Sequence, residues 1–386
     1  IMERRITLKQ AINEAIDLEM ARDERVIMIG EDIVGGFGAD GEKDAWGGVL
    51  GATKGLYGKY GDRLLDAPLS EAAYVGAAVG AATCGMRPIA ELMFIDFVGV
   101  CFDQILNQAA KFRYMFGGKA ETPVVIRALV GAGFSAAAQH SQMLTPMFTH
   151  IPGLKVVCPS TPADAKGLLA QAVRDNDPVI FCEHKALYSM KGEVPEGEYV
   201  IPFGQANIVR EGKDATIVTY GMMVHRSLEA AKLLEKEGVD VEVIDLRTLS
   251  PLDIDTVFRS VEKTGRLVVV ADRGLLSLDN LEALSEIRLE SGKPLEFVLA
   301  VPGRRYSEFA DLLRDFQRQC EATEQEIVDE LPWRGLRLIV AHHPELARQA
   351  QTLRRERIET LETQANTWVG KLDAQDAGVK TRGKKL

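Results

Sequence analysis

Residues 64–94, LLDAPLSEAAYVGAAVGAATCGMRPIAELMF, contain the unit that decides the fold. Pro68 stops the preceding segment, and the run 70–85 has the length and small-residue composition of a buried helix. The next residues, PIAELMF, are an apolar run typical of a strand. A proline turn, a helix and a buried strand in this order predict a parallel sheet covered by helices.

The alternation of helical and strand patterns continues through the first 270 residues. Helices are predicted at 7–23, 70–85, 102–118 and 161–175, and strands at 26–30, 88–94, 122–131, 154–160 and 178–184. These elements predict an α/β domain over residues 1–190. The segment 191–213 is rich in glycine, proline and charge, which predicts a linker.

A second strand–helix alternation follows the linker. Its predicted strands are 215–221, 239–248 and 266–270, and its predicted helices are 222–238 and 251–265. Three strands leave a parallel sheet unfinished. Residues 214–270 are therefore predicted to form a truncated second α/β domain.

The composition is that of a soluble globular protein and indicates a cytoplasmic one. The chain has 386 residues, 46% of them hydrophobic, and a formal net charge of −10, which argues against nucleic acid as a partner. No run approaches the roughly 20 apolar residues of a membrane span, and no signal peptide is expected. The five cysteines lack metal-ligand spacing and are expected to be reduced core residues: Cys84, Cys101, Cys158, Cys182 and Cys320.

Glu71 falls in the first turn of the predicted helix 70–85. One interpretation is a carboxylate favoured by the helix dipole, worth about 0.3–1 kcal/mol. The other is functional, because alanine, valine and glycine surround it for two turns. A desolvated carboxylate can share a proton with a bound base.

Several motifs carry a family resemblance in one order along the chain. DAPLSE, MFIDFVGVCFDQILNQAAKFRYMFGG, AQHSQ, HIPGLKVVCPSTPADAKGLL and DLRTLSPLD resemble the β subunits of thiamine-diphosphate-dependent 2-oxo acid dehydrogenases. The resemblance spans about residues 2–270. EHKALYSMKGEVPEGEY is similar to the acetoin-dehydrogenase-like members.

The resemblance implies a transketolase-like pyrimidine-binding domain and a cofactor, thiamine diphosphate, held between an α and a β chain. Glu71 then hydrogen-bonds N1′ of the aminopyrimidine. Phe97 packs on the aminopyrimidine ring, and Leu69 and Met93 line its pocket. Without the resemblance, these three apolar residues would be interpreted as core.

His140, in GFSAAAQHSQMLTP, follows a run rich in glycine and alanine that predicts a loop. A lone histidine is usually structural, but the resemblance matches His140 to a histidine that faces the substrate and acts at the reacting oxygen. The resemblance also implies a structural potassium ion held by the loop RDNDP. Asp175 and Asp177 are its candidate ligands, and a capped helix end is the alternative.

A missing motif implies a partner chain. The family binds the diphosphate and Mg²⁺ through a GDG motif of the α chain, whereas GADG at 38–41 follows no predicted strand here and predicts a loop. The resemblance therefore implies an α₂β₂ assembly with Mg²⁺ held by the α subunit. It also implies that the acyl group passes to a lipoyl domain of the acyltransferase core.

The sequence changes character after Val270. Glycine falls from 28 in residues 1–270 to 7 in the remaining 116. ADRGLLS and its surroundings resemble DDE-type insertion-element transposases over about 271–365, with Asp272 matching a catalytic aspartate. Residues 366–386 predict a basic, disordered tail. We therefore expect two unrelated sequences to meet near Val270.

These features lead to one predicted function and two alternatives. The chain is predicted to be the β subunit of a 2-oxo acid or acetoin dehydrogenase, which cleaves the bond next to the substrate carbonyl. The first alternative is a non-functional fusion product that cannot assemble. The second is a transposase-derived DNA-binding fragment, against which the acidic charge and the missing carboxylates argue.

Overall fold

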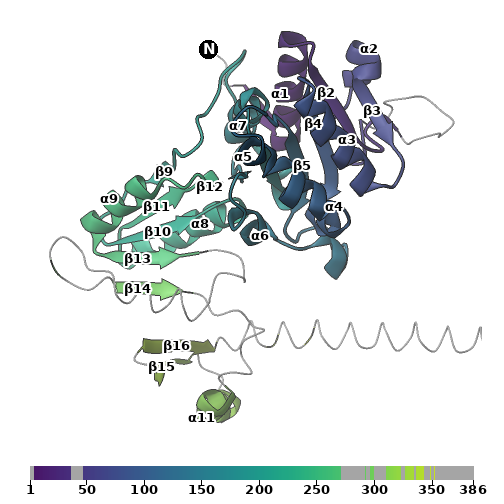
Figure 1. Cartoon of the computed structure of the whole chain (residues 1–386). Helices are drawn as coiled ribbons and strands as arrows, with labels where there is room; N and C mark the ends of the chain where they lie inside the picture. Colours follow the sequence, from purple (N-terminus) through teal and green to yellow (C-terminus); the bar gives the residue numbers. More distant parts are fainter. Residues whose placement is uncertain are drawn as a thin grey trace, which may run out of the picture. The chain divides into compact units, whose positions relative to one another are not determined.

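A computed structural model describes residues 4–35 and 47–270 and, farther along the chain, residues 292, 296–299, 310–322, 327–333, 336–342, 348 and 352. The chain divides into two compact units, Ile1–Val301 and Pro302–Leu386, each of which is described by itself. The first unit contains two α/β domains (Figure 1). Both were predicted from the alternation of apolar patterns.

The first domain is built on a seven-stranded sheet with the order β12-β6-β7-β5-β4-β2-β3. Its strands are β2 (Val26–Glu31), β3 (Leu64–Ala67), β4 (Arg87–Phe94), β5 (Val125–Val130), β6 (Lys155–Val157), β7 (Val179–His184) and β12 (Thr248–Ser250). All neighbours are parallel except β12 and β6, which are antiparallel. The predicted parallel sheet is therefore confirmed.

Helices cover both faces of this sheet. On one face, α1 (Leu8–Arg22) and α7 (Pro162–Arg174) share a core with alternate residues of the strands. On the other face, α3 (Glu71–Thr83), α4 (Val98–Asp103) and α6 (Thr145–Thr149) pack in a second core. The short helix α2 (Leu56–Tyr60) adds Leu56 to the first core. Apolar residues on both faces are the pattern of a buried parallel sheet.

The helix predicted at 102–118 is not continuous, and this expectation was wrong. The main chain leaves helical geometry at Cys101, a π-helix occupies Gln104–Ala109, and α5 covers only Phe112–Met115. Such π-helical turns insert an extra residue into an α-helix, and apolar periodicity alone does not reveal them. Gly117 and Gly118, with φ of 62° and 80°, end the segment as expected.

The second domain has a five-stranded sheet with the order β14-β13-β10-β11-β9. Its strands are β9 (Asn207–Arg210), β10 (Ala215–Thr219), β11 (Val241–Asp245), β13 (Arg266–Val269) and β14 (Glu296–Leu299), and its helices are α8 (Met222–Lys236) and α9 (Ile254–Thr264). The parallel strand β14 lies beyond Val270, where the sequence predicted a join. The sheet thus continues past that point.

The predicted linker 191–213 contains two short strands. β8 (Lys191–Glu193) pairs with β1 (Arg5–Thr7), and β9 forms an edge of the second sheet. The strand β12, which follows β11 in the chain, leaves the second domain and pairs with β6 of the first. The two domains of this unit are therefore joined by main-chain hydrogen bonds as well as by a shared core.

The described part of the second unit consists of α11 (Ala310–Ala322) and an antiparallel hairpin of β15 (Ile327–Trp333) and β16 (Leu336–His342). The GADG segment, Asp272 and the predicted tail 366–386 lie outside the described residues. Within the described portion of the chain, no helix has the length and apolar character needed to cross a membrane.

Candidate functional site

The candidate site lies where the parallel strands of the first domain end. Glu31 is the last residue of β2, Glu71 begins the helix after β3, and Met93 and Phe94 close β4. The loop after β5 carries His140 in a short 3₁₀ turn. Ligands of open α/β sheets bind outside the carboxyl ends of the strands, so the topology brings these residues to the expected edge.

Glu71 is a buried carboxylate, only 7% exposed. None of the residues that the structure describes donates a hydrogen bond to it or forms an ion pair with it. Its negative charge is felt by its neighbours: burial, and then Glu71, raise the pKa of Tyr74 and raise that of the Cys101 thiol to about 12. Burial, Asp32 and Glu71 raise the pKa of Glu31. Glu71 is therefore buried close to a second acidic side chain, Glu31.

His140 is held between two phenylalanine rings. Its ring centroid lies 4.8 Å from that of Phe94 and 5.3 Å from that of Phe97, both edge-to-face. The two phenylalanines are themselves in edge contact at 5.7 Å. The Nδ1 atom of His140 is buried and has no hydrogen-bond partner in the described structure. The structure thus brings the rings of His140 and Phe97 into contact, and their shared role in one site stays a prediction.

The two other predicted pocket residues, Met93 and Leu69, differ in how far their side chains are buried. Met93 is partly buried against the core that also contacts Phe97, and its main chain has a φ of 32°, which is rare outside glycine. Leu69 is 77% exposed on the turn before α3. Most of the Leu69 side chain is therefore not covered by the described residues, although Glu71, two positions later, is buried.

Two functional candidates were missed by the sequence analysis. Glu31 ends a buried strand at the same sheet edge as Glu71, and this position alone could have identified it. Lys185 follows β7, is 1% exposed and donates a hydrogen bond to the carbonyl oxygen of His140. Nothing in the sequence around Lys185 indicates that it lies against His140, because the contact joins residues 45 positions apart.

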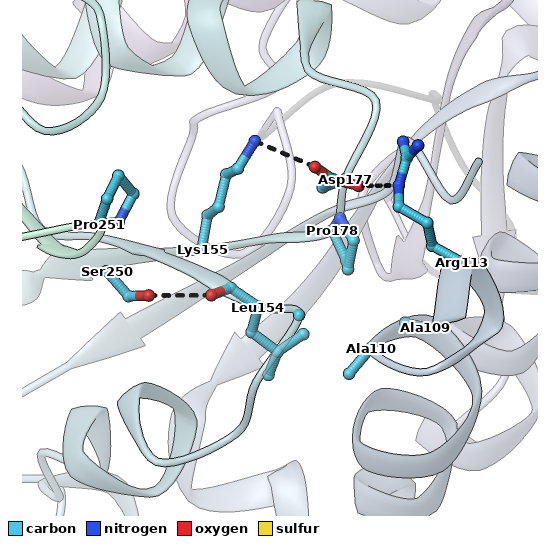
Figure 2. A pocket seen from close by; sticks show the side chains of 10 residues that line it. Ala109, Ala110, Arg113, Leu154, Lys155, Asp177, Pro178, Ser250 and Pro251 are labelled. Atoms are coloured by element: carbon cyan, nitrogen blue, oxygen red, sulfur yellow. Dashed lines mark hydrogen bonds and ion pairs between the residues drawn. The ribbon is translucent and has the colours of Figure 1, made fainter. Parts of the chain in front are cut away.

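Asp177 is paired with Lys155 and Arg113 (Figure 2), and Asp175 is paired with Lys155. The Lys155 ammonium lies 2.6 and 2.7 Å from the two Asp175 oxygens and 3.3 Å from Oδ2 of Asp177. Nε of Arg113 donates to Oδ1 of Asp177 at 2.5 Å. Three of these residues, Arg113, Lys155 and Asp177, line a pocket of about 340 Å³ beside Pro251.

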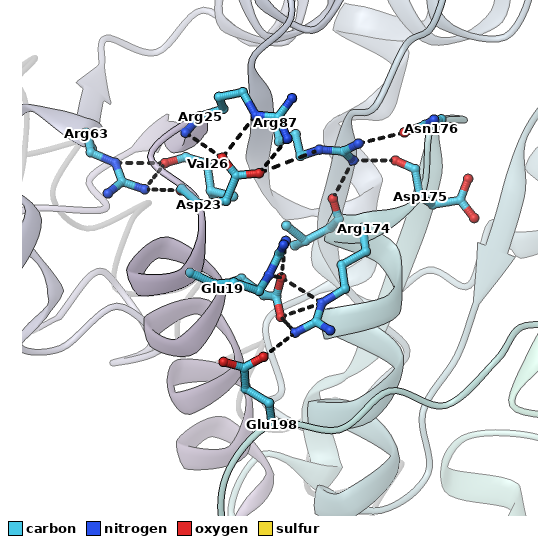
Figure 3. A network of polar contacts seen from close by, with 12 residues as sticks. Glu19, Asp23, Arg25, Val26, Arg63, Arg87, Arg174, Asp175, Asn176 and Glu198 are labelled. Carbon is cyan, nitrogen blue, oxygen red and sulfur yellow. Dashed lines mark hydrogen bonds and ion pairs between the residues drawn. The ribbon is translucent and has the colours of Figure 1, made fainter.

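The end of α7 is closed by another arginine (Figure 3). Nη1 of Arg87 donates to the carbonyl oxygens of Val173 and Asp175, both at 2.9 Å, and Nη2 donates to Oδ1 of Asn176 at 2.6 Å. These contacts satisfy carbonyl groups that a helix end leaves free. Within the described residues, no group of three or more His, Cys, Asp or Glu side chains is arranged to hold a metal ion.

A buried charged network lies deeper in the same sheet. Arg127 on β5 donates to Glu183 on β7 at 2.6 and 3.0 Å and to Glu91 on β4 at 2.7 Å. The Tyr188 hydroxyl also donates to Glu183. Burial lowers the pKa of Arg127, but its two carboxylate partners raise it by more. Two carboxylates share one guanidinium, so burial dominates at Glu91 and raises its pKa despite Arg127.

Comparisons with known proteins match this architecture. The transketolase pyrimidine-binding domain family matches residues 4–191, and the transketolase C-terminal domain family matches residues 204–276. A split-gene transketolase, solved as an inactive β4 tetramer, superposes with a TM-score of 0.59 over 81% of this chain and 93% of its own at 23% identity. That likeness shows the fold.

Sequence relatives are much closer. The β subunit of acetoin:2,6-dichlorophenolindophenol oxidoreductase from Cupriavidus necator is 81% identical over 269 residues, which cover 70% of this chain and 80% of the relative. Its counterpart from Bacillus subtilis is 58% identical over 272 residues, with the same coverage. The pyruvate dehydrogenase E1 β subunit of Rickettsia felis is 41% identical over 330 residues, covering 82% of this chain and 98% of the relative.

Proposed function

This chain belongs to the family of acetoin and pyruvate dehydrogenase β subunits, and we propose that with an α chain it forms a thiamine-diphosphate site that cleaves the bond next to a substrate carbonyl. One observation carries the proposal: Glu71 is 7% exposed and receives no hydrogen bond from the described residues. A buried carboxylate without a donor is costly unless a ligand supplies one.

The side chains of the site, one carboxylate and two apolar groups, fit the pyrimidine half of this cofactor. Glu71 would hydrogen-bond the ring nitrogen and hold or release its proton, while Phe97 and Met93 would contact the ring. When bound, thiamine diphosphate supplies the nucleophilic carbon and the electron sink for the bond cleavage. His140, in contact with Phe94 and Phe97, would face the reacting oxygen.

The second half of the site belongs to an α chain. Leu69 is 77% exposed beside Glu71, which suits contact with another chain or with the cofactor. We assign the diphosphate and Mg²⁺ to that α chain and the assembly to α₂β₂. The complex would act in the cytoplasm and pass its acyl product to a lipoyl domain of the acyltransferase core.

Acetoin is the favoured substrate. The relatives named for acetoin are 81% and 58% identical, whereas those named for 2-oxoisovalerate and pyruvate from Bacillus subtilis are both 48% identical. A 2-oxo acid is the second candidate. Potassium binding by Asp175 and Asp177 stays a prediction, and their pairing with Lys155 and Arg113 argues against it.

A fusion product without function is the second candidate for the whole chain. The transposase-like origin of residues 271–365 stays a prediction. Two observations favour continuation of the domain past Val270. The strand β14 extends the second sheet. The alignment with the Rickettsia felis relative covers 82% of the 386 residues, which is more than the first 270 residues could supply. The two acetoin relatives align over only 269 and 272 residues, which favours a change of sequence.

The test is co-expression with the α chain of the acetoin system, followed by size-exclusion chromatography. The co-eluting complex is assayed for acetoin-dependent reduction of an artificial electron acceptor, with and without thiamine diphosphate. We expect activity that requires the cofactor and falls about 10²–10⁴-fold in Glu71→Gln. A chain that elutes alone or aggregates with no activity would support the fusion-product alternative.

A further inference from the structure

The loop that carries His140 has an unfavourable main-chain conformation. Ser135 and Ala137 have φ of 53° and 60°, values that non-glycine residues rarely adopt. Gly131 at the start of the loop has a φ of 79°, and a Cβ there would lie 2.3 Å from Nε2 of His184, so only glycine fits. Backbone strain of this kind persists where surrounding contacts enforce it, and it gathers at functional sites.

Charged side chains fix the main chain of this loop from two directions. Oδ1 of Asp96 accepts hydrogen bonds from the main-chain N–H groups of Ser141 and Gln142, both at 3.2 Å. The Lys185 ammonium donates to the carbonyl oxygen of His140. The carbonyl of Gln142 in turn accepts from the N–H of Gly131 at 2.8 Å. Three consecutive residues are thus held at four main-chain atoms.

Lys185 is expensive to keep in this position. It is 1% exposed, and among the described residues no carboxylate forms an ion pair with it. Burial lowers its pKa, and the charge of Asp96 only partly opposes this. The ammonium lies 4.8 Å from the centroid of Phe94 and 5.9 Å from that of Phe134, so aromatic faces supply part of its stabilisation.

The same phenylalanine links the ammonium to the histidine ring. Phe94 presents its face to Lys185 and stands edge-to-face with His140. Lys185 therefore contacts the main-chain carbonyl of His140 directly and the ring of His140 only indirectly, through Phe94. A leucine or methionine would fill this volume without the cost of a buried charge, so packing alone does not account for lysine.

We propose that Lys185 and Asp96 are a pair of positioning residues, which hold the His140 main chain so that its ring stays between Phe94 and Phe97. The pair acts through His140 and does not itself contact substrate. The inference rests on the proposed function for the role of His140 in the reaction, and on the contacts above for the positioning.

The first test measures the loop without any reaction. Hydrogen–deuterium exchange is followed in the full chain for wild type, Lys185→Met, Asp96→Ala and, as a control, Lys191→Met, whose side chain is exposed. We expect exchange in peptides covering 138–144 to quicken at least about tenfold in Lys185→Met and Asp96→Ala, with α7 peptides unchanged. Equal protection of 138–144 in wild type and both variants would overturn the proposal.

Two conservative variants guard against misfolding. Lys185→Gln keeps a donor for the His140 carbonyl, and Asp96→Asn keeps an acceptor for the two N–H groups. Both should retain most of the loop protection that the apolar variants lose. If they exchange as fast as Lys185→Met and Asp96→Ala, the specific hydrogen bonds do not hold the loop, and the proposal fails.

The second test is a double-mutant cycle on kcat in the complex with the α chain. Lys185→Met should lower kcat about 10²-fold with little change in KM, and should have almost no further effect in a His140→Ala background. An equal loss in both backgrounds would mean that Lys185 acts without His140. Absence of cofactor-dependent activity in wild type would instead refute the proposed function and leave the exchange result standing.

Discussion

Two helix ends of the first domain carry carboxylates with opposite surroundings. Glu71 begins α3, is buried and receives no hydrogen bond from the described residues. Asp175 follows α7 and is bound by Lys155, with Arg87 on its carbonyl group. The sequence marked both as functional candidates. The contrast indicates that a candidate site carboxylate is distinguished from a structural one less by burial than by whether another side chain of the protein already pairs with it.

The network around Arg127 pairs two buried carboxylates, Glu91 and Glu183, with one buried guanidinium, and we expect the largest effect on stability there. Replacing Arg127 with methionine leaves Glu91 and Glu183 buried without their cation. We expect the free energy of unfolding to fall by about 3–5 kcal/mol. Urea unfolding measures it, with Arg226→Met as the control because Arg226 and its partner Glu229 are exposed. A loss as small as in the control would show that a paired buried acid does not depend on its cation.

The pH dependence of stability tests the comparison at Asp245, which is buried, accepts hydrogen bonds from a hydroxyl and a main-chain N–H, and forms no ion pair with a described residue. Ser160 and the N–H of Arg247 donate to it, while burial and Asp164 raise its pKa to about 7. The folded carboxyl keeps its proton to a higher pH than the unfolded one. Stability should therefore fall as pH rises from about 4 to about 7, by about 1.4 kcal/mol per pH unit, and level off above 7.

Asp245→Asn cannot ionise and should lose this dependence. The difference in unfolding free energy between the variant and wild type should grow in favour of the variant between pH 4 and 7. Urea titrations at half-unit steps measure it. A difference that stays constant with pH would mean that Asp245 is ionised throughout in the folded protein.

Asp175 should show a smaller effect, because its pair with Lys155 is partly open to water. Asp175→Asn weakens the contact with Lys155 and with the N–H of Asp177. We expect a loss of about 1–2 kcal/mol of stability, measured by thermal or urea unfolding. If the variant were instead less stable than wild type only when potassium is present, the carboxylate would be an ion ligand and its pairing with Lys155 would not account for its role.

Glu71 should show the smallest effect on stability of all. Glu71→Gln removes no hydrogen bond from the described structure, so the unfolding free energy of the chain alone should change by less than about 0.5 kcal/mol. The same urea unfolding measures it. A large loss would reveal a structural partner for Glu71 and place it with Asp175.

Local patterns were enough to predict most elements between residues 4 and 270. Apolar periodicity located α1, β2, α3 and β4 to within a few residues, because each buries a face set by its own sequence. The π-helix Gln104–Ala109 was not predicted, because apolar residues alone do not distinguish a π-helical turn from a continuous α-helix.

The candidate site divides in the same way. Glu71 and His140 lie within recognisable motifs, DAPLSE and AQHSQ, so the sequence was enough to propose them as site residues. The roles of Lys185 and Asp96 depend on contacts with a loop 45 positions away, and those of Lys155 and Arg113 on an aspartate 20 or 64 positions away. Only the assembled sheet brings these partners together.

The most direct measurement compares two single substitutions in one assembly. Wild type, Glu71→Gln and Asp175→Asn are purified with the α chain, and kcat for acetoin is measured at saturating thiamine diphosphate. We predict that Glu71→Gln, the stable variant, loses about 10²–10⁴-fold in kcat, while Asp175→Asn, the destabilised one, keeps wild-type activity below its melting temperature. Equal activities for Glu71→Gln and wild type would contradict the account.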